Sequence, residues 1–215
     1  MRVAWLCDFD GTLSPADVGA SLIARFAPDG AERRRELLAR WQRDEIGSRD
    51  LTVEECRDLR VSEPEALAFV RGFALDPGFA AFSSAALARG DEVLVVSDGF
   101  DFYIRELLAR DGLLNIPYLA NRARFENGRL HPEFPHAGGC GRCGNCKAEP
   151  VRRFRAMGLH TVVVGDGLSD RCGAREADRV VARGGLLEWC RREGREVVPF
   201  EGFARLRPGA AVRAC

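Results

Sequence analysis

Short apolar runs and longer stretches with helical spacing alternate along most of the chain. Apolar runs predict buried strands at 2–7, 92–96, 161–164 and 179–182. The segments that follow these runs have helical spacing, and Gly or capping residues mark their ends. Strands that alternate with helices in this way predict an α/β fold, with a doubly wound, Rossmann-like parallel sheet.

One long stretch breaks this alternation. Residues 15–75 contain helical patterns and no strand pattern. We therefore expect a helical cap domain, inserted after the first strand, between the two parts of an α/β core formed by 1–14 and 76–215. At 215 residues the chain is long enough for one such core and its insertion.

Local signals place further elements within this plan. In the insertion we expect helices at 31–46, at 51–59 after a Thr-x-x-Glu capping signature, and from Ser62 onward. In the core, Asn127-Gly128 is a typical tight-turn pair, and it predicts a small β-hairpin insertion at 117–134.

Composition limits the location and the partners. Lys plus Arg and Asp plus Glu number 32 each, so the net charge does not favour nucleic acid as a partner. No run is apolar enough to span a bilayer and no leader precedes the first strand, so we expect a cytoplasmic protein without a membrane partner. The eight cysteines then indicate thiols or metal ligands. No pattern indicates an oligomeric state.

Side chains suited to catalysis stand at the ends of successive predicted strands or before a predicted helix. They are Asp8, Asp10, Ser97, Lys147, Asp166 and Asp170, and Lys147 is the single lysine of the chain. Because the carboxyl ends of parallel strands meet at one edge of the sheet, these groups are expected to converge. Carboxylates, a hydroxyl and an ammonium suit a Mg²⁺ ion that holds a phosphoryl group.

These residues also form a set of motifs. The sequence D-F-D-G-T at 8–12, Ser97, Lys147 and G-D-G-L-S-D at 165–170 resembles the four motifs of haloacid dehalogenase superfamily phosphatases. The resemblance covers essentially the whole chain, and the insertion is similar to the cap of the phosphoserine-phosphatase-like subfamily. Within that subfamily the chain looks like phosphatases of 2-hydroxy-3-keto-5-methylthiopentenyl-1-phosphate, on the evidence of Gly99 to Phe102 and of the residues leading into Lys147.

The resemblance implies a role for each motif residue. Asp8 would attack phosphorus to form an aspartyl-phosphate, and Asp10 would act as general acid and then as general base. The implied ligands of Mg²⁺ are Asp8, Asp10 through its backbone carbonyl, Asp166 and Asp170. The implied phosphate-binding residues are Thr12, Ser97, Asp98 through its backbone, and Lys147.

Other positions concern substrate choice. Asp17 lies where related enzymes carry a carboxylate that contacts substrate, although it could equally cap a helix. Asp101 and Phe102 are candidate pocket residues, with Phe102 as readily part of the core. Two residues depart from the family pattern: Asp98 replaces a glycine, and Ser169 replaces an asparagine typical of phosphoserine phosphatases, which counts against phosphoserine.

A second metal site has a weaker pattern. His136, Cys140, Cys143 and Cys146 have a spacing that could supply tetrahedral zinc. The alternative is a Gly-rich loop with reduced thiols.

The function predicted is that of a Mg²⁺-dependent phosphomonoesterase for a small phosphate ester, with the methylthiopentenyl phosphate favoured. Within enzymes the alternatives are phosphoryl transfer to another alcohol, or hydrolysis of phosphocholine, phosphoethanolamine or phosphoserine. The alternatives from other classes are a phospho-aspartyl receiver and a metal-binding interaction module. Asp10, the insertion and the Asp166/Asp170 pair argue against a receiver.

Overall fold

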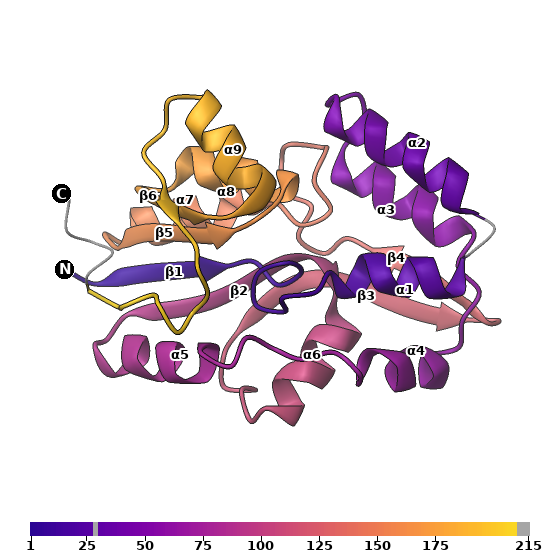
Figure 1. Cartoon of the computed structure of the whole chain (residues 1–215), viewed down its shortest axis with the longest axis horizontal. Helices are drawn as coiled ribbons and strands as arrows, with labels where there is room; N and C mark the ends of the chain where they lie inside the picture. Colours follow the sequence, from indigo (N-terminus) through magenta and orange to yellow (C-terminus); the bar gives the residue numbers. More distant parts are fainter. Residues whose placement is uncertain (28–29, 210–215) are drawn as a thin grey trace.

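The computed structural model describes residues 1–27 and 30–209. Its central feature is a seven-stranded sheet in the order β4-β3-β2-β1-β5-β6-β7, parallel except for the edge pair β3 and β4 (Figure 1). The strands are β1 (Val3–Cys7), β2 (Glu92–Phe100), β3 (Tyr118–Glu126), β4 (Arg129–Glu133), β5 (His160–Gly165), β6 (Arg179–Ala182) and β7 (Val198–Pro199). The predicted Rossmann-like α/β fold is confirmed.

Helices cover both faces of this sheet. On one face lie α5 (Phe79–Ala88) and α6 (Asp101–Arg110), and on the other lie α7 (Ala148–Ala156), α8 (Arg171–Glu176) and α9 (Gly184–Arg192) (Figure 1). Every residue of β1 is buried, and its side chains alternate between two core clusters on opposite faces. A continuous apolar run is therefore what this central strand requires.

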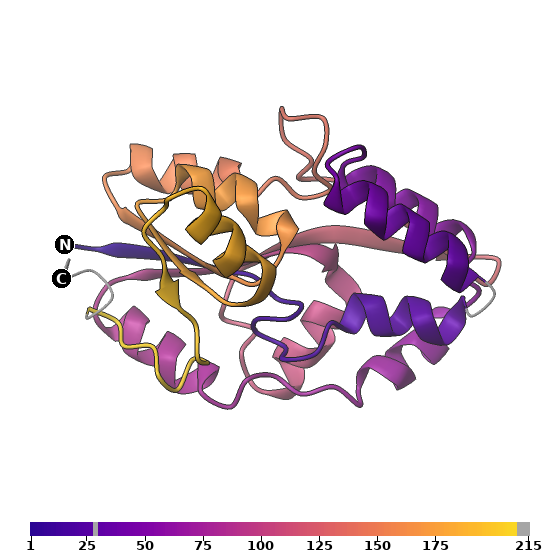
Figure 2. The same cartoon turned by 45° about the horizontal axis from the view of Figure 1, so that its top comes forward.

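The insertion is divided between two environments. Its helices are α1 (Val18–Phe26), α2 (Ala31–Gln42), α3 (Ser48–Arg57) and α4 (Glu63–Val70). Apolar residues of α1 and α4 belong to the main core of the α/β domain. Helices α2 and α3 share a separate small cluster, and only Cys56 of these two helices reaches the main core among the described residues. Figure 2 shows α2 and α3 as a helical pair set apart from α7, α8 and α9.

Two predicted helix boundaries in the insertion are wrong. The structure begins α3 at Ser48, and the Thr-x-x-Glu signature lies inside that helix, where Thr52 Oγ1 donates to the Ser48 carbonyl at 2.9 Å. Helix α2 ends at Gln42, because the backbone turns at Asp44 into the left-handed region (φ 62°). By contrast, the predicted start of α4 is confirmed by a capping box between Ser62 and Glu65.

The predicted hairpin is present but extends the main sheet. Positive φ angles at Asn127 (52°) and Gly128 (69°) form the tight turn between β3 and β4. The first residues of β3 also pair in parallel with β2, so the hairpin continues the sheet edge. Its turn reaches the insertion, where Val61 N donates to the Gly128 carbonyl at 2.9 Å.

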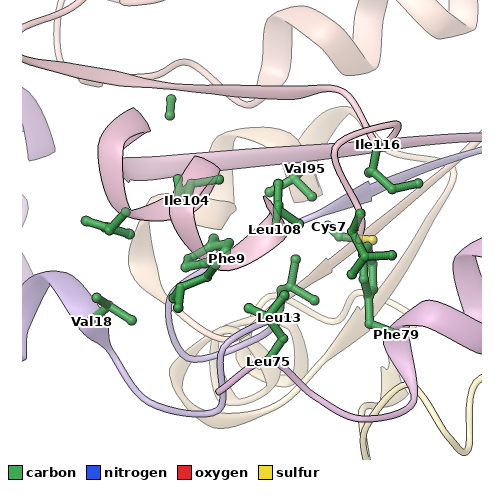
Figure 3. Close-up of a cluster of buried hydrophobic side chains, with 14 of the residues drawn as sticks. Cys7, Phe9, Leu13, Val18, Leu75, Phe79, Val95, Ile104, Leu108 and Ile116 are labelled. Atoms are coloured by element: carbon green, nitrogen blue, oxygen red, sulfur yellow. The ribbon is translucent and has the colours of Figure 1, made fainter. Parts of the chain in front are cut away.

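The main core lies directly beneath the carboxyl end of β1. Figure 3 shows Phe9 among Leu13, Val18, Ile104 and Leu108, and each of these side chains is fully buried. Burying a side chain the size of Phe9 stabilises the fold by about 2–3 kcal/mol. Because neighbouring side chains in an extended segment point to opposite sides, burial of Phe9 turns the flanking acidic side chains away from the core.

The helices of the described ranges include none with the length and hydropathy needed to cross a membrane.

Candidate active site

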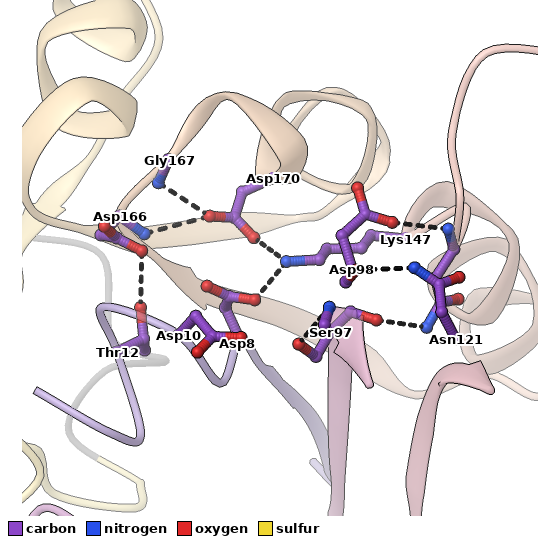
Figure 4. A network of polar contacts seen from close by, with 12 residues as sticks. Asp8, Asp10, Thr12, Ser97, Asp98, Asn121, Lys147, Asp166, Gly167 and Asp170 are labelled. Carbon is purple, nitrogen blue, oxygen red and sulfur yellow. Dashed lines mark hydrogen bonds and ion pairs between the residues drawn. The ribbon is translucent and has the colours of Figure 1, made fainter. Parts of the chain in front are cut away.

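A cavity of about 560 Å³ lies at the carboxyl edge of the parallel strands. Its floor includes Asp8, Asp10, Ser97 and Asp166 from the core. Residues of α1, α2 and α3 form the opposite wall. The structure thus brings motif residues from distant parts of the chain close together at one end of this cavity (Figure 4).

Lys147 joins the first and last motifs. Its ammonium contacts Asp8 Oδ1 and lies 2.6 Å from Asp170 Oδ1, with only 2% of the residue exposed (Figure 4). Burial lowers the pKa of Lys147, but the carboxylates of Asp170, Asp8 and Asp98 more than offset this and hold the pKa above its ordinary value. Lys147 is therefore a permanent buried cation at the base of the site.

The acidic residues of the last motif are fixed from two directions. Thr12 Oγ1 donates to Asp166 Oδ1 at 3.1 Å, while Asp170 Oδ2 accepts from the backbone N–H groups of Asp166 and Gly167 at 3.0 and 2.9 Å (Figure 4). Gly11, with φ 75°, passes so close to Asp166 that a Cβ at this position would overlap its carboxylate. These contacts leave little freedom for either carboxylate.

Three of these carboxylates could hold a cation. Oxygens of Asp8, Asp166 and Asp170 lie within 4.8 Å of one another. Burial raises the pKa of Asp8 well above its ordinary value, and repulsion from Asp170 adds to the rise while Lys147 opposes it. One ammonium does not balance three acids. A hard divalent cation suits this set of oxygen donors and would supply the missing charge.

Asp10 has a different environment from Asp8. Its Oδ1 accepts from the N–H groups of Val18 and Gly19 at 2.8 and 3.3 Å, at the start of α1, and its Oδ2 accepts from the Tyr103 hydroxyl at 2.6 Å. Burial raises the pKa of Asp10 to about 7, with a contribution from Asp17, and the three hydrogen bonds limit the rise. A carboxyl group with this pKa can both donate and accept a proton near neutrality.

The carboxylate of Asp98 is turned toward the loop that precedes Lys147. Asp98 Oδ1 accepts from Asn145 N at 2.5 Å (Figure 4). The same loop is tied to β2 by a hydrogen bond from Asn145 Nδ2 to the Ser97 carbonyl at 2.9 Å. Burial raises the pKa of Asp98, and Lys147 limits the rise. Asp98, which stands where the family pattern has a glycine, thus helps to hold the loop that carries Lys147.

Ser97 stands at an irregularity of its strand. The register between β2 and β3 shifts between Val96 and Phe100, and Ser97 Oγ accepts from Gly99 N at 2.9 Å. Ser97 is 1% exposed and lines the cavity. The predicted strand end at Val96 was too early, since β2 runs to Phe100 before α6 begins.

The three residues expected to select substrate lie in different places. Asp17 lines the cavity and also caps α1, accepting from Ala20 N at 2.7 Å. Asp101 accepts from Ala123 N at 3.0 Å, and Phe102 packs against other aromatic rings. The structure does not bring Asp101 or Phe102 to the cavity wall.

The proposed zinc ligands are only partly brought together. Sulfur atoms of Cys140, Cys143 and Cys146 lie within 4.8 Å of one another, but the His136 side chain is not part of this group. His136 contributes its backbone carbonyl, which accepts from Cys146 N at 2.9 Å.

Several residues that line the cavity are not singled out by the sequence pattern. Tyr103 is 93 positions from Asp10, and its pattern is that of an ordinary buried helix residue. Leu38 and Trp41 have the helical spacing of a packed face, and this spacing does not reveal that they also line a cavity. Arg34 and Glu55 pair across α2 and α3 at 2.8 Å within the same wall.

Comparison with known proteins decides the family. A family model described as haloacid dehalogenase-like hydrolase matches residues 5–175. The chain belongs to this family. It is 31% identical over 199 residues to a 2-hydroxy-3-keto-5-methylthiopentenyl-1-phosphate phosphatase of Brevibacillus brevis, which covers 87% of this chain and 85% of that protein. A phosphatase with the same name from Exiguobacterium sibiricum is 31% identical over 209 residues, 94% of each chain.

Solved structures of this family share the fold. A phospho-aspartyl intermediate analogue of phosphoserine phosphatase superposes with a TM-score of 0.73 at 22% identity, covering 95% of this chain and 96% of that one. The expected membership of the haloacid dehalogenase superfamily, and the expectation of an enzyme that is a phosphatase, are thus confirmed. These findings favour an enzyme over the two other classes considered, a phospho-aspartyl receiver and a metal-binding interaction module.

Proposed function

We propose that this haloacid dehalogenase-like hydrolase is a Mg²⁺-dependent phosphomonoesterase that passes through an aspartyl-phosphate on Asp8. The observation that carries the proposal is the contrast between two neighbouring acids. Asp8 is held by the buried ammonium of Lys147, whereas Asp10 is held by neutral donors and has a pKa of about 7. One acid suits nucleophilic attack and the other suits proton transfer.

In the first half-reaction an Asp8 oxygen forms a bond to phosphorus, and the bond from phosphorus to the ester oxygen breaks. Asp10 gives its proton to that oxygen, which leaves as the alcohol. In the second half-reaction Asp10 takes a proton from water as the water oxygen attacks phosphorus. The bond from phosphorus to Asp8 then breaks and phosphate is released, which restores Asp8 and a protonated Asp10.

The acidic cluster is the proposed magnesium site. Asp8 and Asp166 would provide carboxylate oxygens and Asp10 its backbone carbonyl, because the Asp10 carboxylate is engaged by Tyr103 and α1. Both oxygens of Asp170 already accept hydrogen bonds, so Asp170 is assigned to orienting Lys147 and the 166–167 backbone. Bound Mg²⁺ would offset the negative charge of the carboxylates and of the phosphoryl group.

The phosphoryl oxygens are assigned to Lys147, whose ammonium contacts Asp8, and to Ser97 and the N–H groups around Asp98, which line the cavity beside Asp8. Thr12 is fully buried and donates to Asp166. We therefore assign Thr12 to positioning Asp166, in place of the phosphate contact expected from its motif.

The wall formed by the insertion favours a substrate with an apolar part. Ile23, Leu38, Trp41 and Leu51 line it, and the charges of Arg34 and Glu55 are paired with each other. Together with the names of the relatives, this supports 2-hydroxy-3-keto-5-methylthiopentenyl-1-phosphate, whose methylthio tail is apolar. Phosphoserine would instead need partners for both an ammonium and a carboxylate.

The predicted domain division is kept as part of this proposal. Residues 15–75 form the cap insertion, and its α2 and α3 segment covers the cavity with a small apolar cluster of its own, joined to the main core at Cys56. Movement of this segment would open and close the site. A cytoplasmic location is likewise proposed, since the cysteines of the described residues are free thiols.

A substrate panel tests the assignment. The purified chain with Mg²⁺ should hydrolyse the methylthiopentenyl phosphate with a kcat/KM at least about 10-fold above that for phosphoserine, phosphocholine or phosphoethanolamine. An equal or reversed preference would reject the substrate. Phosphoryl transfer is tested in the same assays by adding an alcohol acceptor, and the proposal expects free phosphate to account for the ester consumed.

A further inference from the structure

A cluster of sulfur atoms lies beside the active site. Cys140, Cys143 and Cys146 come from the loop before α7, and their Sγ atoms lie within 4.8 Å of one another. A fourth sulfur reaches the same cluster from another element: Cys172 Sγ in α8 lies 3.8 Å from Cys143 Sγ. Among the described residues, a group of three loop sulfurs is therefore joined by a fourth from α8, which adjoins the group through Cys143.

The sulfur separation fits a metal better than a disulfide. With four zinc–sulfur bonds of about 2.3 Å in a tetrahedron, neighbouring sulfur atoms are about 3.8 Å apart. A disulfide requires about 2.05 Å. The distance between Cys143 and Cys172 equals the edge of such a tetrahedron.

The backbone of the loop is also shaped for thiolate ligands. Cys143 N donates to Cys140 Sγ at 3.4 Å, and Gly141 between them has a φ of 69°. An N–H that points at sulfur stabilises its negative charge, which a thiolate ligand needs. Gly138, with φ 63°, passes so close to Cys146 that a Cβ there would overlap the cysteine side chain.

We propose that Cys140, Cys143, Cys146 and Cys172 bind a structural Zn²⁺ ion. This site is separate from the acidic cluster and does not rest on the proposed function. All-thiolate donors favour zinc over magnesium, and four protein ligands leave no open position for catalysis. Cys172 takes the place that the sequence pattern gave to His136.

A zinc ion bound here would link three segments around the active site: the loop before Lys147, the segment of Asp170, and the insertion. Cys146 precedes Lys147, and Cys172 follows Asp170 by two positions, so one ion would fix the two segments whose side chains meet at 2.6 Å. The loop also holds the insertion, because Gly144 N donates to Ser48 Oγ at 3.2 Å and Arg142 Nη2 contacts the Asp44 carbonyl at 2.7 Å. Zinc would thereby position the base of the cap and the buried lysine together.

Metal analysis of the full chain tests this proposal without an activity assay. The protein is purified without a metal-chelating tag, under reducing conditions, and dialysed against metal-free buffer. We expect about one zinc per chain. Cys140→Ser and Cys172→Ser should weaken zinc binding by roughly 100-fold or more and lower the thermal midpoint. Cys140 is exposed, so its replacement leaves the core packing unchanged.

Matched variants separate this site from its alternatives. Three variants should keep full zinc content. His136→Ala changes the ligand that the sequence pattern suggested, Cys190→Ser changes a buried cysteine outside the cluster, and Asp166→Asn changes the acidic site. Co²⁺ in place of zinc should give sulfur-to-cobalt charge-transfer absorption that Cys172→Ser weakens. The proposal is overturned by wild-type protein without zinc, by full zinc content in Cys172→Ser, by zinc loss in His136→Ala, or by a Cys143–Cys172 disulfide in freshly purified protein.

Discussion

The Tyr103 hydroxyl, on helix α6, donates a hydrogen bond of 2.6 Å to Asp10 Oδ2, 93 positions earlier in the sequence. Tyr103 is fully buried, and burial together with Asp10 raises the pKa of its own hydroxyl well above the ordinary value. Tyr103 is therefore a permanent donor at working pH. It sets both the orientation and the proton affinity of Asp10.

Replacing this donor should move the acidity of Asp10. The Tyr103 hydrogen bond lowers the Asp10 pKa, so Tyr103→Phe should raise it further, by about one unit for a bond to a charged group. Aspartyl-phosphate formation requires protonated Asp10. The alkaline limb of kcat/KM, measured against pH, should therefore move to higher pH by about one unit.

The other tyrosine of the chain provides the control. Tyr118 lies on β3 and its side chain contacts neither Asp10 nor the cavity. Tyr118→Phe should leave the alkaline limb in place. An unmoved limb in Tyr103→Phe would show that the rate does not report the ionisation of Asp10.

The raised pKa of Asp10 should also cost stability at neutral pH. The folded state holds the proton up to about pH 7, whereas an unfolded aspartate releases it near 3.8. Between these values the folded state binds more protons, so a rise in pH lowers the free energy of unfolding. Asp10→Asn removes the ionisable carboxyl and with it this pH-dependent loss of stability. In EDTA, the variant should gain stability relative to the wild type as pH rises from 4 to 7, reaching about 1–3 kcal/mol.

Urea unfolding at pH 4, 5.5 and 8 measures this effect. The exposed surface acid Asp111 gives the control, and Asp111→Asn should follow the wild-type curve. A constant difference between Asp10→Asn and the wild type at all three pH values would contradict the raised pKa. The same Asp10→Asn protein should lose about 10²- to 10⁴-fold in turnover.

Gly99 is required by the same pair of side chains. A Cβ at Gly99 would overlap the Tyr103 hydroxyl and the Asp10 carboxylate, so Gly99→Ala must displace one of them. We expect kcat/KM to fall by about 100-fold or more, as for other misplacements of a catalytic group. Gly72→Ala is the comparison, because its Cβ would meet only the Phe69 carbonyl at 3.4 Å. Equal activity in the two variants would mean that Asp10 needs no exact placement.

Removal of the divalent cation should stop the reaction. Without it, burial and Asp170 keep the pKa of Asp8 raised, and nothing beyond Lys147 offsets the charge that the carboxylates share with the phosphoryl group. EDTA should abolish turnover, added Mg²⁺ should restore it, and Asp166→Asn should raise the Mg²⁺ concentration needed by at least about 10-fold. Turnover that persists in EDTA would show that the reaction does not require a divalent cation. Zinc content, measured in parallel, should not change on adding Mg²⁺.

Much of the fold and of the site could be predicted from local pattern. The acids at the strand ends can be predicted from the sequence, because an apolar run that stops at a charged residue marks both a strand and its carboxyl end. The lone lysine before α7 is equally visible. Topology then brings these ends together without any further information.

The remaining features depend on tertiary contacts that no short spacing encodes. Cys172 is 26 positions beyond Cys146, in a helix whose pattern is unremarkable, so the nearer His136 was the natural candidate. The start of α3 differs from the prediction because Asp50, three residues after Gly47, supplies the capping carboxylate, while the Thr-x-x-Glu pattern lies within the helix. The spacing of Leu38 and Trp41 predicts a packed helix face, because helical spacing does not distinguish a packed face from a cavity wall.

Identification of the phosphorylated residue tests the central claim most directly. The protein is mixed with substrate and Mg²⁺, quenched in acid within the first turnover, and digested for mass spectrometry. The account predicts phosphate on Asp8, absent in Asp8→Asn, which should keep its fold and lose hydrolysis. Phosphate on another residue, or sustained hydrolysis by Asp8→Asn, would contradict the account.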